Sequence, residues 1–390
     1  MALRLGLVCD FWEERWPSMD LYSTMLAAEF AKNHSAEVHV VQLRPPFHKR
    51  FSRLPGCKGS SFLWNADRLI NRFHDYEIWL KTQIHKFDIF DLVDHSYAQL
   101  VTKLPQNRVV VHLHDLDTFR CLFEPGKEPR PYWFRAMAQR ILDGLRQAAY
   151  FICNSQWTRS QVLQYGIASE DRVDVMYPGV NTEFFSQIGS PVEEQASSMI
   201  AGTEGLYLLH VGSTIPRKRI DILLRVFALI SKEVPDVRLV RVGGEFTAEQ
   251  TRLMSSLGVQ GKVTAIPAVP ISTLKVIYKR AALLLQPSDA EGFGLPVIEA
   301  MACGCPVVAS DLPMLREAGG IAAEYCAVGE TDVWKASVLA LLRERKTEPE
   351  RWTLRRDEAR RQASKFTWSN HVREAIGVYQ RILEATAVGN

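Results

Sequence analysis

The sequence predicts an α/β protein made of two doubly wound units, and three observations support this. Strand-like apolar runs alternate with segments of helical periodicity along the whole chain of 390 residues. The strand-like runs are apolar on both faces, which is typical of parallel sheets covered by helices on both sides. The polar stretch 186–204, rich in Gly, Ser, Pro and Glu, interrupts this alternation and reads as a linker.

The expected elements follow in order from short apolar runs, taken as strands, and from longer segments with a 3.6-residue period, taken as helices. In the first half we expect strands at 3–9, 37–43, 108–113, 149–153 and 172–176. In the second half we expect strands at 206–211, 237–242, 282–286 and 306–309. Helices are expected at 20–32, 134–148, 155–165, 219–231 and 330–344.

The composition favours a globular protein with a hydrophobic core and gives no indication of a nucleic-acid-binding, secreted or membrane-spanning protein. A hydrophobic content of 47% supports sizeable cores, and a net charge of +3 is too small to indicate a nucleic-acid-binding protein. Residues 1–10 read as a buried strand and lack the features of a signal peptide, and no apolar run approaches the roughly 18 residues of a membrane span. Seven scattered cysteines predict reduced thiols in a cytoplasmic protein.

A glycine-rich turn near the C-terminal end predicts an anion site. Glu291 and Glu299 flank this turn, which follows an apolar strand and leads into a helix. Gly292 and Gly294 allow backbone amides to approach a ligand, and Pro296 suits the first turn of a helix. Because a helix N-terminus attracts anions, a phosphate here would lie between two carboxylates. The arrangement fits a sugar nucleotide, whose hydroxyl groups the carboxylates would bind.

The sequence around this turn resembles the signature of the retaining glycosyltransferases of family 4. The segments that carry the resemblance are Pro287-Ser288, EGFGLP and EAMACGCPVVASD. The resemblance covers most of residues 85–385 and implies the GT-B fold, in which two Rossmann-like domains face each other across a cleft. We therefore expect an acceptor-binding domain at 1–185 and a nucleotide-sugar-binding domain at 205–368. The resemblance also implies that a closing helix at 369–390 packs back on the first domain.

The same resemblance assigns residues to the donor. Lys218 is similar to the residue that holds the diphosphate, and Arg217 would supply the charge that many members carry at the position of Ser213. Glu291 would bind the transferred sugar and Glu299 the ribose. The remaining residues expected to bind the donor are Gly212, Ser213, Gly292, Phe293, Gly294, Leu295, Ile266 and Val269. No cofactor is expected beyond the sugar nucleotide, which is a co-substrate.

In the first half, His114 ends a buried strand and resembles the family histidine at which donor sugar and acceptor approach each other. A purely structural histidine is the alternative, and His112 and His95 share the neighbourhood. Three histidines could suggest a metal ion, but their spacing is poor and the family is metal-independent. We expect no metal site.

The loop 10–20 departs from the family pattern, because Ser18 and Met19 stand where many members have two glycines. The loop is aromatic and acidic, which suggests an acceptor recognised by Trp16, together with Trp12 and the carboxylates of Glu13 and Glu14. Packing of these tryptophans in the core is the alternative.

Residues 44–86 hold nine Lys and Arg against three Asp and Glu. Such a region could touch anionic lipid at the inner face of a membrane, or could be an ordinary solvated surface.

Taken together, the sequence indicates a retaining glycosyltransferase that uses a nucleoside-diphosphate sugar. The acceptor would be a glycan, a lipid-linked molecule or a small molecule, as in polysaccharide biosynthesis. Two alternatives stay open: a GT-B sugar-nucleotide epimerase and a non-catalytic sugar-nucleotide-binding protein. The sequence leaves the sugar, the base and the oligomeric state open.

Overall fold

The computed structural model describes residues 2–53, 60–186, 189–200 and 205–388. The chain forms two compact units, Met1–Gly179 with Trp368–Asn390, and Val180–Thr367. Each unit contains a six-stranded parallel sheet with helices on both faces, so the predicted doubly wound α/β fold is confirmed. The boundary falls at Gly179, six residues before the end expected for the first domain.

The first sheet has the strand order β2-β1-β3-β4-β5-β6. Its strands are β1 (Leu3–Val8), β2 (Val38–Leu43), β3 (Ile89–Leu92), β4 (Val109–Leu113), β5 (Tyr150–Cys153) and β6 (Val173–Val175). The helices of this unit are α1 (Pro17–Asn33), α2 (Ser61–Ile70), α3 (Tyr76–Lys81), α4 (Arg120–Phe123), α5 (Tyr132–Leu145), α6 (Gln156–Gln164) and α15 (Trp368–Val388). A π-helical turn, Asn71–Asp75, joins α2 to α3.

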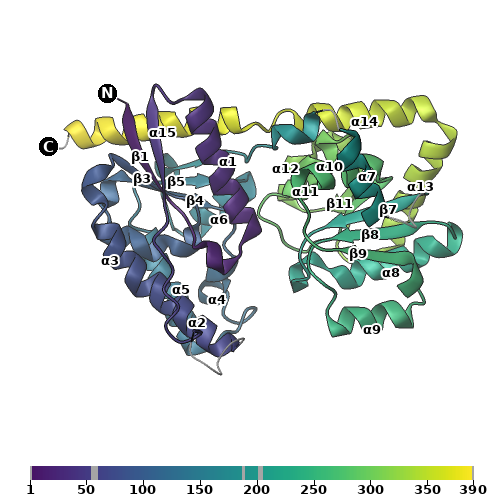
Figure 1. Cartoon of the computed structure of the whole chain (residues 1–390), viewed down its shortest axis with the longest axis horizontal. Helices are drawn as coiled ribbons and strands as arrows, with labels where there is room; N and C mark the ends of the chain where they lie inside the picture. Colours follow the sequence, from purple (N-terminus) through teal and green to yellow (C-terminus); the bar gives the residue numbers. More distant parts are fainter. Residues whose placement is uncertain (1, 54–59, 187–188, 201–204, 389–390) are drawn as a thin grey trace. The chain divides into compact units, whose positions relative to one another are not determined.

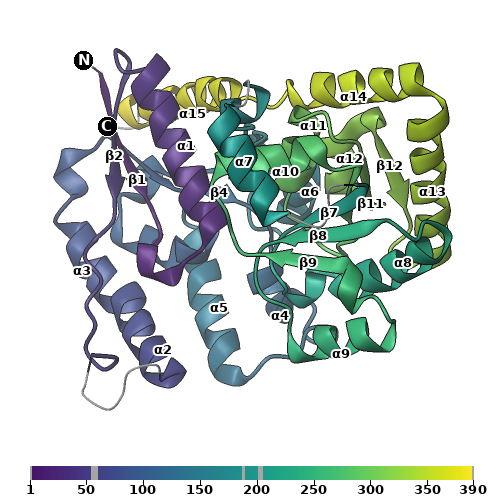
Figure 2. The same cartoon turned by 45° about the vertical axis from the view of Figure 1, so that its right-hand side comes forward.

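Side chains on successive residues of a strand point to opposite faces, so each strand serves two cores. Val109 and Val111 of β4 pack with residues of α3, α5 and α6, whereas Val110 packs with residues of α1 and α15. Figures 1 and 2 show α1 and α15 on the same side of this sheet. The last helix of the chain is therefore part of the first unit, where Val372 and Tyr379 are fully buried.

The second sheet has the order β12-β11-β10-β7-β8-β9. Its strands are β7 (Tyr207–Val211), β8 (Arg238–Val242), β9 (Val263–Ile266), β10 (Leu283–Gln286), β11 (Val307–Ser310) and β12 (Ala323–Cys326). The helices are α7 (Ser190–Met199), α8 (Ile220–Glu233), α9 (Ala248–Ser256), α10 (Ile271–Arg280), α11 (Leu295–Ala302), α12 (Pro313–Gly319), α13 (Thr331–Thr347) and α14 (Pro349–Ala363). In Figure 1, α8 and α9 lie below these strands, and α10, α11 and α14 lie above them.

The stretch 186–204, expected to be a linker, contains a helix in the part that the structure describes. Helix α7 occupies Ser190–Met199 and packs against α10, and its Ala196 is fully buried. The polar composition misled the interpretation because, among the described side chains of α7, only Ala196 is buried. Within the described part of the chain, six cysteines are buried and none forms a disulfide, while Cys57 lies outside it. Of the described helices, none is long and apolar enough to cross a membrane.

Candidate active site

The carboxylate of Glu291 is the centre of a compact polar cluster in the second unit. Glu291 follows β10, and Lys218 and Arg217 lie in the single turn Pro216–Lys218 after β7. Lys218 Nζ donates to Glu291 Oε1 at 2.6 Å and to Oε2 at 2.9 Å. Arg217 Nη1 donates to Oε2 at 3.3 Å and to the carbonyl of Ala290 at 3.0 Å. Both predicted cations therefore meet at the predicted carboxylate, although they lie more than 70 residues away in the sequence.

Electrostatics keep this carboxylate ionised. Burial would raise the pKa of Glu291, since only 8% of the residue is exposed. The charges of Lys218 and Arg217, with hydrogen bonds from Lys218 and Ser288, outweigh burial and hold the pKa below its ordinary value of 4.5. Lys218 is also only 8% exposed, so the two form a largely desolvated ion pair.

The turn between Glu291 and α11 is shaped by glycine. Gly294 precedes the helix at φ +111°, a conformation that side chains rarely allow, and a Cβ there would lie 2.7 Å from Leu315 Cδ2. Gly292 and the buried Phe293 complete the turn, and Leu295 begins α11. The N-terminus of α11 thus lies four residues from Glu291, as the sequence predicts, and presents the positive end of the helix dipole there.

The loop after β7 approaches the neighbouring strand β8 very closely. A Cβ on Gly243 would lie 2.0 Å from the carbonyl oxygen of Gly212, so the position requires glycine. Gly212 itself lies beside Lys218, since a Cβ on it would be 3.7 Å from Lys218 Cε. The Gly212 amide donates to the carbonyl of Val242 at 2.9 Å, which fixes the loop that continues into Ser213.

Ile266 and Val269 lie at the same end of this sheet, at the outer strand. The amide of Gly243 donates to the carbonyl of Ile266 at 2.9 Å, which joins the end of β9 to the glycine contact just described. Val269 follows in the loop before α10 and is half-buried. We expected both residues to contact the nucleotide base. In the structure they lie at the edge of the sheet that also carries Gly212 and Lys218.

Glu299 lies on α11, eight residues after Glu291 in the sequence. Its Oε2 accepts a hydrogen bond from the hydroxyl of Tyr278 on α10 at 3.0 Å. Burial raises the pKa of Glu299 to about 7, and the hydrogen bond from Tyr278 opposes this rise only in part. The pKa values of the two carboxylates are therefore shifted in opposite directions, because Glu291 has two cationic partners and Glu299 has a neutral one.

In the first unit, His114 follows β4 with its imidazole in a defined protonation state. Its Nε2 lies 2.7 Å from the carbonyl of Val93, so Nε2 must carry the proton and donate it. Burial lowers the pKa of His114 to about 4, despite the nearby carboxylate of Asp94. The ring is therefore neutral near pH 7, and its Nδ1 can accept a hydrogen bond from a hydroxyl group.

The neighbouring histidines, His112 and His95, contact other side chains of the same unit. His112 is buried between Asp91 and Tyr22, with His112 Nε2 3.0 Å from Asp91 Oδ2 and His112 Nδ1 3.0 Å from the Tyr22 hydroxyl. His95 lies within 4 Å of the carboxylates of Asp94 and Asp115. Across the described residues, no group of three or more His, Cys, Asp or Glu side chains is arranged to hold a metal ion.

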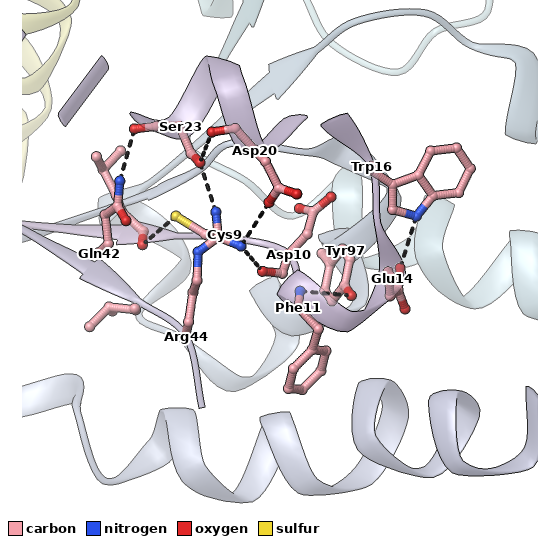
Figure 3. Close-up of polar contacts among 12 residues, drawn as sticks. Cys9, Asp10, Phe11, Glu14, Trp16, Asp20, Ser23, Gln42, Arg44 and Tyr97 are labelled. Atoms are coloured by element: carbon pink, nitrogen blue, oxygen red, sulfur yellow. Dashed lines mark hydrogen bonds and ion pairs between the residues drawn. The ribbon is translucent and has the colours of Figure 1, made fainter. Parts of the chain in front are cut away.

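The loop after β1 is organised by Arg44, as Figure 3 shows. Its guanidinium donates to the carbonyl of Asp10, to Asp20 Oδ1 at 3.1 Å and to Ser23 Oγ at 2.8 Å. It also stacks on the ring of Trp12, 3.8 Å from the ring centroid. These contacts fix the turn that leads into α1.

Three residues assigned to the acceptor lie at the start of α1, and Trp16 and Ser18 are exposed while Met19 is half-buried. Trp16 is 49% exposed and donates from Nε1 to Glu14 Oε2 at 3.1 Å, so it is not a core residue. The suggestion that Glu14 recognises an acceptor is wrong. Its side chain is fully buried and pairs with Arg68 at 2.9 Å and with Arg72 at 3.6 Å.

Two side chains of the Glu291 cluster were not assigned a role from the sequence. Gln286 Nε2 and Ser288 Oγ donate to Glu291 Oε1 at 2.6 Å and 2.7 Å. Both residues are fully buried. A polar residue closing the apolar strand of β10 is the signal that could have revealed Gln286, because such a strand end faces the ligand side of an α/β sheet.

Comparison with known proteins identifies the family of this chain. The family model described as "Glycosyltransferase Family 4" matches residues 21–184, and "Glycosyl transferases group 1" matches residues 193–353. Together they span most of the chain, which therefore belongs to the family 4, group 1 glycosyltransferases with the GT-B fold.

Among curated relatives, D-inositol 3-phosphate glycosyltransferase of Mycobacterium tuberculosis is 28% identical over 325 residues. That match covers 77% of this chain and 63% of the relative, so the chain spans less than two thirds of the relative's length.

Two solved structures share the fold. HepE of Anabaena, in complex with UDP and glucose, matches with a TM-score of 0.70 and 16% identity over 97% of this chain and 100% of that chain. Sucrose-phosphate synthase of Thermosynechococcus elongatus matches with a TM-score of 0.72 and 18% identity over 98% of this chain and 100% of that chain.

Proposed function

We propose that this protein is a retaining glycosyltransferase that transfers a sugar from a nucleoside-diphosphate sugar to a glycan, lipid-linked or small-molecule acceptor. The observation that carries the proposal is the cluster of Lys218 and Arg217 on Glu291, four residues before the N-terminus of α11. Two cations and the positive end of a helix dipole suit a diphosphate that gains charge as it leaves. The carboxylates of Glu291 and Glu299 suit hydroxyl groups of the sugar and the ribose.

In this mechanism the acceptor oxygen bonds to the anomeric carbon while the bond from that carbon to the phosphate oxygen breaks. Attack occurs on the face from which the diphosphate departs, and the leaving phosphate oxygen takes the acceptor's proton. Lys218, Arg217 and the backbone amides of the turn after Glu291 stabilise the charge on the diphosphate. His114 stays neutral and accepts a hydrogen bond from a hydroxyl of the sugar or the acceptor, and Trp16, Ser18 and Met19 border the acceptor.

The proposal is tested with a thermal-shift screen against UDP, GDP, ADP and dTDP sugars. UDP sugars come first because the HepE structure contains UDP. A ligand at about 100 times its dissociation constant stabilises the folded state by about 2.7 kcal/mol, which such a screen detects readily. Detection of a glycosylated product separates a transferase from an epimerase, and turnover of any kind excludes a binding protein. If no sugar nucleotide shifts the melting temperature, the proposal fails.

Activity is expected to survive EDTA. The charge on the leaving diphosphate would be balanced by Lys218, Arg217 and helix amides, which take the place of a divalent cation. The measurement is nucleoside-diphosphate release with and without chelator, and with Mg²⁺ or Mn²⁺ added back. Loss of activity in EDTA and its recovery with either metal would contradict this part of the mechanism.

The ionisation of Glu299 is expected to make donor binding depend on pH. Hydroxyl groups of a ribose donate to the ionised carboxylate, so binding should release a proton wherever Glu299 is protonated beforehand. With its pKa raised to about 7, affinity for the nucleoside diphosphate should increase as the pH rises towards 7 and then level off. Titration calorimetry at about pH 6 in two buffers of different ionisation enthalpy measures the released proton. The matched control Glu299→Gln should release none from this site.

We also propose that the protein works in the cytoplasm and contacts the inner face of a membrane through its first unit. A groove of about 520 Å³ lies between α5 and the segment of α2 and its π-helical turn, lined by Leu69, Ile70, Phe73, His74, Trp133, Ala136, Met137 and Arg140. Trp133 is 64% exposed, and Lys49, Arg53 and Arg135 are exposed cations in this unit. Aromatic and basic side chains together suit an anionic lipid surface.

The region 44–86 itself is less basic than its sequence suggests, because Arg44, Arg50, Arg68 and Arg72 all pair with carboxylates. Lys58 lies outside the described residues. Sedimentation with vesicles is expected to carry the protein down with anionic lipid and much less with neutral lipid. Trp133→Ser should weaken this binding without changing diphosphate affinity. Equal binding of wild type and variant would contradict the assignment of the groove.

A further inference from the structure

Glu291 receives hydrogen bonds of two different kinds. Lys218 and Arg217 are cations, and under the proposed function they also bind the diphosphate. Gln286 and Ser288 are neutral, are 0% exposed, and hold Glu291 Oε1 at 2.6 Å and 2.7 Å. A diphosphate would share the charges of Lys218 and Arg217 with the Glu291 carboxylate, whereas a ligand outside the protein cannot reach the two buried donors Gln286 and Ser288.

The side chain of Gln286 makes its hydrogen bonds within this cluster. Its Nε2 donates to Glu291 Oε1 and, at 3.3 Å, to Ser288 Oγ, while its Oε1 has no hydrogen-bond partner among the described residues. The opposite orientation of the amide would place an oxygen against the carboxylate. Burying an unpaired amide oxygen costs free energy that an apolar side chain would not cost, so the bond from Nε2 is what the residue contributes here.

The position of these donors in the fold makes them rigid. Gln286 is the last residue of β10, which is paired with β7 on one side and β11 on the other. Ser288 follows two residues later and is also fully buried. Lys218, in contrast, reaches Glu291 with a flexible four-carbon side chain from a separate loop.

We propose that Gln286 and Ser288 are positioning residues that keep the Glu291 carboxylate oriented towards the transferred sugar when Lys218 and Arg217 engage the diphosphate. This inference rests on the proposed function and assigns it two further residues. It predicts that the pair matters for turnover more than for diphosphate affinity. A misplacement of about 1 Å in a reacting geometry can cost about 100-fold in rate.

The test compares Ser288→Ala and Gln286→Met with the matched control Ser310→Ala. Ser310 ends the neighbouring strand β11, is equally buried, and its Oγ has no hydrogen-bond partner in the described part of the chain. Turnover is measured as nucleoside-diphosphate release from the sugar nucleotide that wild type uses. We expect a loss of about 10- to 100-fold in each of the first two variants, diphosphate affinity close to wild type, and a control like wild type. Turnover matching the control, or equal losses of turnover and diphosphate affinity, would overturn the inference.

A pH measurement adds a readout that a merely structural role would not change. Without either donor the pKa of Glu291 should rise. The acid limb of kcat, measured at saturating sugar nucleotide where the bound ribose already keeps Glu299 ionised, should therefore move to higher pH in Ser288→Ala and Gln286→Met but stay in place in Ser310→Ala. An unmoved acid limb would contradict the inference.

Failure of the proposed function gives a different result. If wild type releases no nucleoside diphosphate from any sugar nucleotide, the difference between wild type and Ser288→Ala in the pH dependence of unfolding still reports the change in the pKa of Glu291. The inference then requires the acid-side loss of stability to move to higher pH in Ser288→Ala, and an unmoved midpoint would overturn it.

Discussion

Lys218→Ala is expected to lower turnover by about 10²- to 10³-fold, the loss typical of removing one preorganised group that stabilises developing charge. Lys218 Nζ lies within 3 Å of both oxygens of Glu291, so its ammonium is already held beside the turn that leads into α11. The assay is single-turnover release of the nucleoside diphosphate, with affinity for the diphosphate measured in parallel. Turnover near that of wild type would remove Lys218 from the mechanism.

The same substitution is expected to destabilise the second unit, which the sequence alone would not suggest. Removing one partner of a buried ion pair costs about 3–5 kcal/mol when the other charge is left without partners. Here Arg217, Gln286 and Ser288 still bind Glu291, so we expect a loss nearer to about 1–3 kcal/mol. Lys218→Met, which keeps the apolar stem, is the control that separates the lost charge from lost packing.

The sign of the pH dependence follows from the lowered pKa of Glu291. A carboxyl group whose pKa is lowered by folding stabilises the protein above its ordinary value, here 4.5, and loses that contribution as the pH falls through the folded value. The melting temperatures of wild type and Lys218→Ala should therefore differ most near neutral pH and converge in acid. A constant difference at all pH values would mean that the ion pair is not its cause.

The sequence predicted the residues of this cluster better than their contacts. Lys218, Glu291 and Glu299 were found because each lies in a local motif whose glycines and proline shape the backbone. That Lys218 and Glu291 pair was not predictable, because 73 residues separate them and only the order of strands β7 and β10 brings them together. Gln286 was missed for a related reason. The shape of the turn after β10 brings its side chain to Glu291, and no sequence motif predicts this contact.

The strands show where local reasoning works and where it stops. Long apolar runs such as β4 were placed to within a residue. Strand β3 was missed because it has only four residues and includes Asp91, which is fully buried only because His112 and Tyr379 bind it. Glu14 was misread for the same physical reason: an acid in an exposed-looking loop acquires arginine partners from residues more than 50 positions away.

Glu299→Gln and Glu291→Gln are expected to separate binding from turnover. Glu299 has a neutral partner in Tyr278 and is proposed to hold the ribose, so Glu299→Gln should weaken the free nucleoside diphosphate by about 10- to 100-fold, the value of a hydrogen bond to a charged group. Tyr278→Phe is the matched control, because it removes the hydroxyl that holds Glu299 but leaves its charge.

Glu291→Gln should leave affinity for the free nucleoside diphosphate intact or increase it, because it removes an anion that shares Lys218 and Arg217 with the diphosphate. Turnover should still fall by about 10²- to 10³-fold, since the charge of Glu291 is needed as the sugar moves off the phosphate. Calorimetric titration of both variants with the nucleoside diphosphate and with the intact sugar nucleotide decides between these roles. If both variants lose diphosphate affinity equally, the two carboxylates do not divide the donor as proposed, and Glu291 instead holds Lys218 in place for the phosphate.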